Sequence, residues 1–311
     1  MSAVQGSIAV PRWRFLLLLA GLVAMPGLLL FKVAALQVLP SEQRGAEFLQ
    51  DQGERRTLRE ERVPAYRGEI SDRNGAPLAV STPVSTLLGN MIIAGERWSP
   101  KQVAVLAELI DEPVANLQRR LDANVKNQHL YIARQLPLQV AEQAMALQLP
   151  GLREQREYKR YYPAGEVAAQ LVGLTDIDDR GIEGLEKSYQ QVLAGEHGLV
   201  QVIKDRSGRT IKSVAQLKEP KMGDSLRLTI DLRVQYAAYR ALKQAVKEHQ
   251  AEGGSVVVLD VQTGEVLAMA NQPSFNPNDR ADLNLAADRN RAVQDMLEPG
   301  STVKPLALLA A

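Results

Sequence analysis

Ser301 and Lys304 are the two residues of this chain whose types and spacing best suit covalent chemistry. They lie in the stretch LEPGSTVKP at 297–305, where a Pro-Gly bend precedes the serine. Residues three apart on a helical turn share one face, with Cβ atoms about 5–6 Å apart, so a neutral lysine amine can take the proton of the serine hydroxyl. The pattern therefore predicts a nucleophile, Ser301, and its general base, Lys304.

The expected place of Ser301, at the start of a helix, would stabilise negative charge that develops nearby. The first backbone N–H groups of a helix are free, so the N–H of Ser301 can serve as one oxyanion donor. Pro305 disfavours the α conformation at Lys304, and we therefore expect a tight or irregular first turn. The tetrad alone also fits a capping serine beside a surface lysine, because Ser-x-x-Lys often arises by chance.

Other polar groups give weaker signals. The histidines are scattered along the chain: His129, His197 and His249. The adjacent acids Asp178 and Asp179 could form a metal site or an acid pair, but without further ligands in frame a solvated turn is favoured. Tyr161 and Tyr162, beside Arg160, could stack on a sugar or base, but packing is favoured. We expect no cofactor and no metal ion.

Composition restricts the function classes. The 311 residues are 45% hydrophobic, which suffices for one large domain or two ordinary ones. The formal charge of +1 gives no basic surplus, so nucleic acid is not expected as a partner. There is no cysteine, which excludes disulfides, cysteine-based metal sites and a lipid-modified cysteine.

An apolar segment near the amino terminus predicts a transmembrane helix over 15–38. Residues 15–31 carry no charge, and the apolar run continues beyond Lys32 for a total of about 24 residues, or about 36 Å of helix against about 30 Å of hydrocarbon. Arg12 and Arg14 precede it, which places a cytoplasmic tail at 1–14 and the remainder outside. The pair Pro26-Gly27 predicts a kink.

A cleaved signal peptide is the alternative for this segment. Its apolar region would usually span about 7–15 residues and end in a small-x-small site. This run is longer, and its only such candidate, Val33-Ala34-Ala35, follows a lysine. A retained membrane anchor is favoured.

The rest of the chain divides into a charged stalk and two folded regions. The stalk is expected at 39–62, a pedestal at 63–219 and a second domain at 224–311, with a linker near 219–223. Apolar periodicity and turn residues predict the following elements. Helices are expected at 100–110 after the cap Ser99, at 113–121, 138–147, up to Leu193 and at 231–249; strands are expected on both sides of Asn74-Gly75, and at 199–204, 210–214, 225–230, 255–259 and 265–270.

Several blocks together resemble the class B penicillin-binding proteins. Four of them, at 258–269, 273–278, 289–292 and 298–301, are similar to the start of the family's transpeptidase domain. Three further blocks resemble its pedestal motifs: 67–79, 160–173 and 181–198. Within the class, 81–84 and 175–181 are similar to the septal enzyme of cell division rather than to the elongation enzyme.

The resemblance implies both a fold and an activity. The expected fold is an α+β pedestal, dimerisation-type in this family, followed by the start of a β-lactamase-like α/β transpeptidase domain and preceded by one transmembrane helix. The implied activity is crosslinking of peptidoglycan stem peptides by D,D-transpeptidation at Ser301, with Lys304 as base, and acylation by β-lactams. A membrane glycosyltransferase and other division proteins are the implied partners, at the bacterial inner membrane with the bulk of the chain in the periplasm.

Two rival functions remain open. A non-catalytic scaffold of the division machinery would use the anchor and the pedestal alone, and a β-lactam sensor or hydrolase would share the serine motif. The family's Ser-x-Asn and Lys-Thr-Gly motifs lie downstream of the tetrad, and neither occurs between Lys304 and Ala311. We therefore expect the chain as given to be a fragment without detectable acylation.

Overall fold

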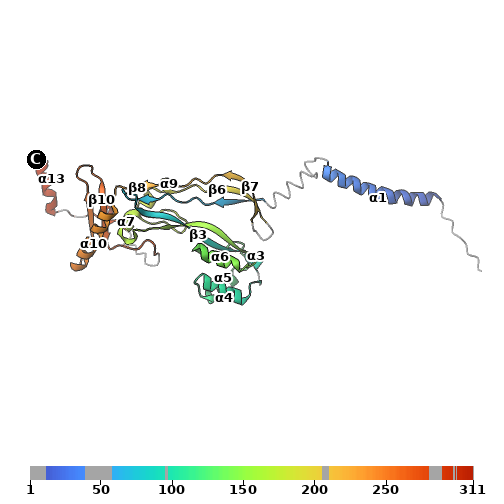
Figure 1. Ribbon diagram of the computed structural model, residues 1–311, viewed down its shortest axis with the longest axis horizontal. Coiled ribbons are helices and arrows are strands. Elements are labelled where there is room, and N and C mark those ends of the chain that lie inside the picture. Colours follow the sequence, from blue (N-terminus) through green and yellow to red (C-terminus); the bar gives the residue numbers. More distant parts are fainter. Residues whose placement is uncertain are drawn as a thin grey trace, which may run out of the picture. The chain divides into compact units, whose positions relative to one another are not determined.

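The computed structural model describes residues 12–38, 58–94, 97–204, 210–279, 289–296, 298 and 300–310. The chain divides into two compact units. The first contains Met1–Glu60, Gln201–Arg206 and Thr210–Val214; the second contains Glu61–Val200, Ser207–Arg209 and Ala215–Ala311. Figure 1 shows the elements of both units.

The first unit contains the long apolar helix α1, Arg12–Val38. Its stretch Arg12–Val33 has a mean hydropathy of 2.3, and none of it is buried by the other residues that the structure describes. The helix continues through Pro26. By length and composition α1 can cross a membrane, a test that a signal sequence near the amino terminus also passes.

A three-stranded sheet has the order β1-β6-β7. Its strands are β1 (Leu58–Val63), β6 (Gly198–Lys204) and β7 (Thr210–Lys218). The last two are the strands predicted at 199–204 and 210–214, and β7 is longer than expected. The predicted stalk needs correction at its end, because residues 58–62 lie in β1. Although this segment is charged, pairing with β6 provides hydrogen-bond partners for its backbone N–H and C=O groups. Residues 39–57 lie outside the described residues.

The larger sheet of the second unit has the order β4-β3-β2-β8, with β5 also paired to β3. Its strands are β2 (Ile70–Ser71), β3 (Pro77–Gly89), β4 (Leu130–Leu136), β5 (Leu152–Tyr161) and β8 (Leu226–Arg227). The predicted turn at Asn74-Gly75 is confirmed: β2 and β3 are antiparallel, and Gly75 has φ +86°. The strand predicted at 225–230 is shorter, and β4 and β5 were not predicted.

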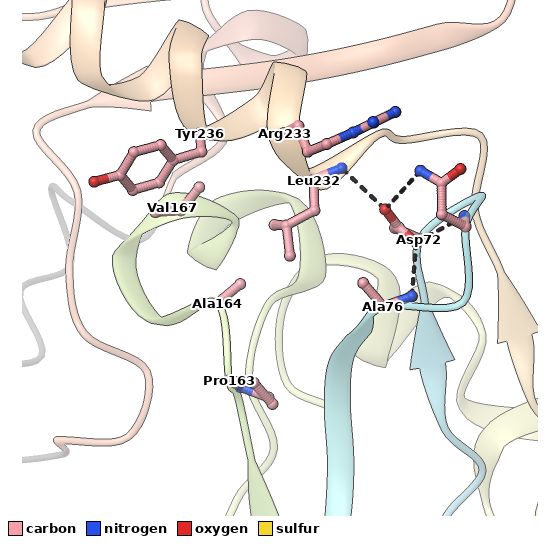
Figure 2. A pocket seen from close by; sticks show the side chains of 9 residues that line it. Asp72, Ala76, Pro163, Ala164, Val167, Leu232, Arg233 and Tyr236 are labelled. Atoms are coloured by element: carbon pink, nitrogen blue, oxygen red, sulfur yellow. Dashed lines mark hydrogen bonds between the residues drawn. The ribbon is translucent and has the colours of Figure 1, made fainter.

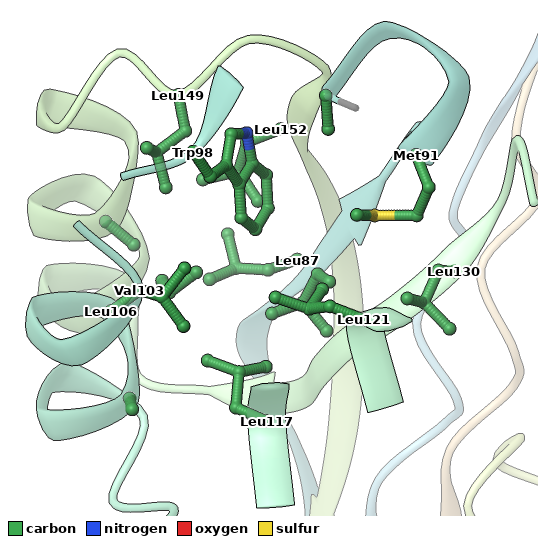
Figure 3. Close-up of a cluster of buried hydrophobic side chains, with 14 of the residues drawn as sticks. Leu87, Met91, Trp98, Val103, Leu106, Leu117, Leu121, Leu130, Leu149 and Leu152 are labelled. Atoms are coloured by element: carbon green, nitrogen blue, oxygen red, sulfur yellow. The ribbon is translucent and has the colours of Figure 1, made fainter. Parts of the chain in front are cut away.

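Short helices pack against one end of β3, β4 and β5 (Figure 1). They are α3 (Met91–Ala94), α4 (Pro100–Leu109), α5 (Val114–Ala123) and α6 (Leu138–Ala146). Ser99 caps α4, as predicted, by a reciprocal pair of hydrogen bonds with Gln102. Figure 3 shows the apolar core between these helices and β3, in which Leu87 and Leu106 are fully buried.

Further short helices follow β5, and a longer one opens the second predicted domain. They are η2 (Gly165–Val167), α7 (Ala169–Val172), α8 (Gly184–Ser188), α9 (Gln190–Leu193) and α10 (Leu232–Glu248). The single helix expected up to Leu193 is thus two, separated at Tyr189. The long helix α10 begins at its cap Asp231, as predicted, and packs on the antiparallel strands β9 (Gly254–Leu259) and β10 (Val266–Gln272).

Candidate active site

The Ser-x-x-Lys tetrad lies on two short consecutive helices. Gly300–Val303 form the 3₁₀ turn η3, and Lys304–Leu309 form α13. The irregular first turn expected from Pro305 is therefore present. Gly300 has φ +53°, a conformation that suits glycine, so the chain bends sharply just before Ser301. Ser301 lies in the 3₁₀ turn and Lys304 opens α13, and residues three apart on successive helical turns lie on one side, which favours an approach of the two side chains.

Both side chains of the tetrad are exposed. Among the residues that the structure describes, no hydrogen bond joins the Ser301 hydroxyl to the Lys304 amine. The two short helices thus place Ser301 and Lys304 on consecutive turns, but the hydrogen bond between hydroxyl and amine is not formed in this structure. A capping serine next to a surface lysine would look the same, so the function of the pair needs independent support.

Asn271 holds the segment that leads to the tetrad. This side chain is buried at the end of β10, and its Oδ1 accepts hydrogen bonds from the Ser255 hydroxyl (2.7 Å) and the Ala292 N–H (2.9 Å). Its Nδ2 donates to Asn290 Oδ1 (2.9 Å). The helix α12 (Arg291–Gln294) is thereby attached to the sheet. The sequence analysis did not select Asn271; its place just beyond an apolar strand was the only available signal.

Three charged side chains form a buried network in the pedestal. Arg67 Nε donates to Glu186 Oε2 (2.5 Å), and Arg160 Nε donates to Glu186 Oε1 (2.7 Å). All three side chains are buried. They come from the three separate blocks that carried the pedestal resemblance, so one carboxylate ties the three blocks together. A carboxylate can accept two arginines in this way because its two oxygens offer separate acceptor sites.

Asp178 and Asp179 have different surroundings. They lie in a turn closed by Asp176, whose Oδ1 accepts from the N–H groups of Asp178 and Arg180 (both 2.9 Å). Asp178 is exposed and pairs with Arg134 (2.9 Å), as a solvated turn predicts. The prediction is wrong for Asp179: burial raises its pKa to about 6. No group of acids and histidines in the described part of the chain is suited to hold a metal ion.

Tyr162 is a packing residue, as favoured by the sequence. Its ring is buried, and its hydroxyl accepts a hydrogen bond from the Thr175 N–H (3.0 Å). Burial also raises the pKa of this phenol. Tyr161 points the other way along the strand and is about half exposed.

The turn between β2 and β3 contacts the start of α10, as Figure 2 shows. Asp72 Oδ1 accepts from the N–H groups of Asn74 and Ala76 (both 2.8 Å), and Oδ2 accepts from the Leu232 N–H (3.0 Å). Burial of Asp72 opposes ionisation, but these N–H groups outweigh it and lower the pKa of the carboxyl. Arg73 also pairs with Glu265 (3.1 Å). The pedestal block at 67–79 is therefore joined to the second predicted domain.

Comparison with known proteins decides the family. The model of the penicillin-binding protein dimerisation domain matches residues 62–228, more than half of the chain. The chain belongs to the penicillin-binding proteins. The model of the penicillin-binding protein transpeptidase domain matches residues 254–311, the segment that contains Ser301 and Lys304.

Relatives of this penicillin-binding protein include named transpeptidases. The peptidoglycan D,D-transpeptidase FtsI of Escherichia coli K12 is 42% identical over 307 residues, covering 96% of this chain and 50% of its own length. The probable peptidoglycan D,D-transpeptidase PenA of Neisseria meningitidis serogroup A is 44% identical over 266 residues, covering 85% of this chain and 46% of its own length. The chain thus spans about half the length of the curated relatives it matches.

Solved structures agree on the fold. A peptidoglycan synthetase from Bifidobacterium adolescentis is 25% identical with a TM-score of 0.54, covering 81% of this chain and 50% of its own. The penicillin-binding protein PBP2 from Helicobacter pylori, solved in complex with MreC, is 21% identical with a TM-score of 0.61, covering 81% of this chain and 52% of its own. The α+β pedestal followed by the start of a transpeptidase domain is confirmed.

Proposed function

We propose that this penicillin-binding protein crosslinks peptidoglycan stem peptides by D,D-transpeptidation, with Ser301 as nucleophile and Lys304 as general base. The observation that supports this most directly is the location of the tetrad: both residues lie on consecutive turns inside the segment that matches the transpeptidase domain. The relatives named as D,D-transpeptidases match 96% and 85% of this chain.

The proposed reaction has two halves. Lys304 Nζ takes the hydroxyl proton while Ser301 Oγ attacks the carbonyl carbon of the penultimate D-alanine. The peptide C–N bond then breaks, and the terminal D-alanine leaves with the proton. An amine of a neighbouring stem peptide attacks the resulting ester, its proton passes back to the serine oxygen, and a new peptide bond replaces the acyl-serine. Penicillins would stop the sequence at the acyl-serine.

Fluorescent penicillin tests the assignment of the two residues. The whole gene product should form a covalent adduct on the tryptic peptide that contains Ser301, and Ser301→Ala should abolish labelling. Lys304→Ala should slow acylation by about 10²–10⁴-fold, because a general base contributes about this much. Thr302→Ala is the matched control, since the hydroxyl of Thr302 lies next to the nucleophile and should not be acylated. An adduct on another residue would overturn the assignment.

We further propose a septal role. The FtsI relatives and the blocks at 81–84 and 175–181 support it over a role in elongation. The partners would then be a membrane glycosyltransferase and other division proteins. Depletion of the gene should produce filaments without septa; rounded cells that still divide would indicate elongation instead.

The proposed location is the inner membrane, with a single span by α1 and the pedestal in the periplasm. The uncharged run at 15–31 and the cations Arg12 and Arg14 support this orientation. Alkaline phosphatase fused after residue 60 should be active. An inactive fusion would contradict the orientation, and release of the chain from membranes would indicate cleavage of α1.

The proposed domains are a pedestal at 63–219 and a transpeptidase region at 224–311. A scaffold function, without acyl transfer, is the second candidate; it would use α1 and the pedestal, and the match of the dimerisation domain to residues 62–228 supports it. It would leave penicillin labelling at zero in the whole gene product while Ser301→Ala still supports septation.

A further inference from the structure

One face of α10 carries a row of cationic side chains that the proposed acyl transfer does not use. Arg233, Arg240 and Lys247 are spaced by seven residues, and Tyr236 and Lys243 occupy the intervening turns with the same spacing. All five are exposed. Residues at this spacing lie on one side of a helix. We call these five residues the basic row.

Two hollows border the basic row and meet at Tyr236. The larger, of about 850 Å³, lies between α10, η2 and the turn that follows β2 (Figure 2). Much of its wall is apolar, from Pro163, Ala164, Val167 and Leu232. The smaller, of about 380 Å³, runs along α10 between Tyr236 and Lys247. The larger, mostly apolar hollow therefore lies next to the exposed cationic side chains of α10.

The acidic groups near these hollows are already engaged. Asp72, in the wall of the larger hollow, accepts backbone hydrogen bonds on both of its oxygens. Asp231 pairs with Arg233 (2.7 Å), and Glu166 pairs with Lys243 (2.9 Å). Neither Arg240 nor Lys247 makes an ion pair within the described residues, so the surface has unpaired positive charge.

We propose that this surface binds an acidic amphipathic helix of another protein. The seven-residue spacing matches the repeat by which two helices pack side by side. The basic row extends over 233–247, about 21 Å of helix, which can face about four turns of a partner. Carboxylates on the partner would meet Arg240 and Lys247, and one large apolar side chain would fill the larger hollow as an anchor.

The test uses the whole gene product in a neutral detergent and a synthetic peptide as probe. The probe is a fluorescent amphipathic helix of about three heptads, with Leu at its apolar positions and Glu at the others. A second peptide has Lys in place of every Glu. Fluorescence anisotropy should show binding of the Glu peptide only, weakening as NaCl rises from about 0.05 to 0.3 M.

Two variants examine the two parts of the surface. Arg240→Glu combined with Lys247→Glu should weaken binding of the Glu peptide at least tenfold. Ala164→Leu, which adds methyl groups inside the larger hollow, should weaken it about fivefold without changing its dependence on salt. The matched control is Lys101→Glu with Arg119→Glu, which reverses two exposed cations on α4 and α5 and should bind as the unaltered chain does.

Several results would overturn the proposal. Equal loss of binding in the control variant would show an effect of net charge alone. Absence of binding, or binding of both peptides, would remove the charge argument. Sedimentation that reveals self-association through the basic row, or binding to anionic vesicles in place of the Glu peptide, would assign the surface to a second copy or to lipid.

Discussion

Asp179 is a carboxyl group whose burial and charged neighbours act in opposite directions. Burial is the larger effect and raises its pKa, Arg67 and Arg160 lower it, and Glu186 raises it further, with a net value of about 6. Its Oδ1 is buried without a hydrogen-bond partner among the described residues, so the ionised form is poorly stabilised. Because the folded pKa lies above the unfolded value of about 3.9, this group favours folding at low pH, and its contribution is lost as pH rises through 6.

Asp179→Asn should therefore stabilise the pedestal at pH 7.5 by up to about 3 kcal/mol, the equivalent of a two-unit shift. Asparagine also tolerates the φ of 64° found at this position. Pulse proteolysis across a urea series at pH 7.5 and pH 4.5 measures the effect, which should fall to about a third at the lower pH, because that pH lies between the unfolded and the folded pKa. Asp178→Asn is the matched control and should change the free energy of unfolding by no more than about 1 kcal/mol. Destabilisation by Asp179→Asn at pH 7.5 would show that the ionised form is the preferred one.

Glu186→Gln preserves shape but removes the charge shared by Arg67 and Arg160. The two guanidinium groups would then be buried without their counter-ion, and we expect a loss of about 3–5 kcal/mol in the free energy of unfolding. The same urea series measures it. Glu154→Gln, at a partly exposed carboxylate on β5, should cost less than about 1 kcal/mol. Equal costs for both changes would indicate that the buried network adds nothing to stability.

At the scale of elements, the sequence predicts those whose signals are local. The cap Ser99 and the apolar period of α4, the turn at Asn74-Gly75, and the cap of α10 all depend on a few neighbouring residues, and all three are present. The strand β5 could not be found in this way, because its sequence LREQREYKRY has no apolar alternation. It forms because β3 pairs with it from Val80 to Gly89, a contact between distant segments.

In the candidate site, too, the features that depend on neighbouring residues were predictable and the contacts between distant segments were not. Ser301, Lys304 and the irregular turn at Pro305 follow from spacing and from proline sterics. The attachment of α12 by Asn271 depends on side chains that meet only after β9 and β10 have paired. Such contacts carry no periodic signal, so the sequence could not show them.

Asn271→Ala should loosen α12 without unfolding α10. Removing the side chain deletes the hydrogen bonds to Ser255, Asn290 and the Ala292 N–H. Hydrogen exchange followed by mass spectrometry should show faster exchange at 289–296 and unchanged exchange in α10. In the whole gene product, penicillin acylation should slow by about tenfold or more, because small displacements of reacting groups are costly. Ser213→Ala, at an exposed position of β7, is the control, and unaltered exchange at 289–296 would refute the role of Asn271.

Across the whole molecule, buried apolar side chains are unevenly distributed among the described residues. The two larger apolar clusters draw nearly all of their residues from 70–193, whereas the third, below α10, contains only three buried side chains. The helices α12, η3 and α13 have no buried residues. Leu306, Leu308 and Leu309 are each at least 67% exposed.

Limited trypsin digestion should therefore cut first after Arg289 or Arg291, and a product that contains 61–200 should persist. Segments with few buried contacts open at low free-energy cost, which is why they are cleaved early. Mass spectrometry of a digestion time course identifies the first cuts. Early cleavage after Arg153 or Arg156 in β5 would contradict this order.

The pairing of β2 with β8 also sets an order of assembly. Ile70 lies beside Leu226 in a parallel register, although roughly 150 residues separate them along the chain. Closing so long a loop reduces the conformational entropy of the chain, and the contacts that offset this loss form only after the loop has closed. During synthesis the sheet therefore stays open at this edge until residue 227 has emerged, and its partly built form is exposed to chaperones and proteases in the meantime. The two residues of β8, which lie beyond the proposed pedestal at 63–219, thus complete this sheet last, and a ribosome that stalls before them leaves a pedestal whose sheet lacks its edge strand.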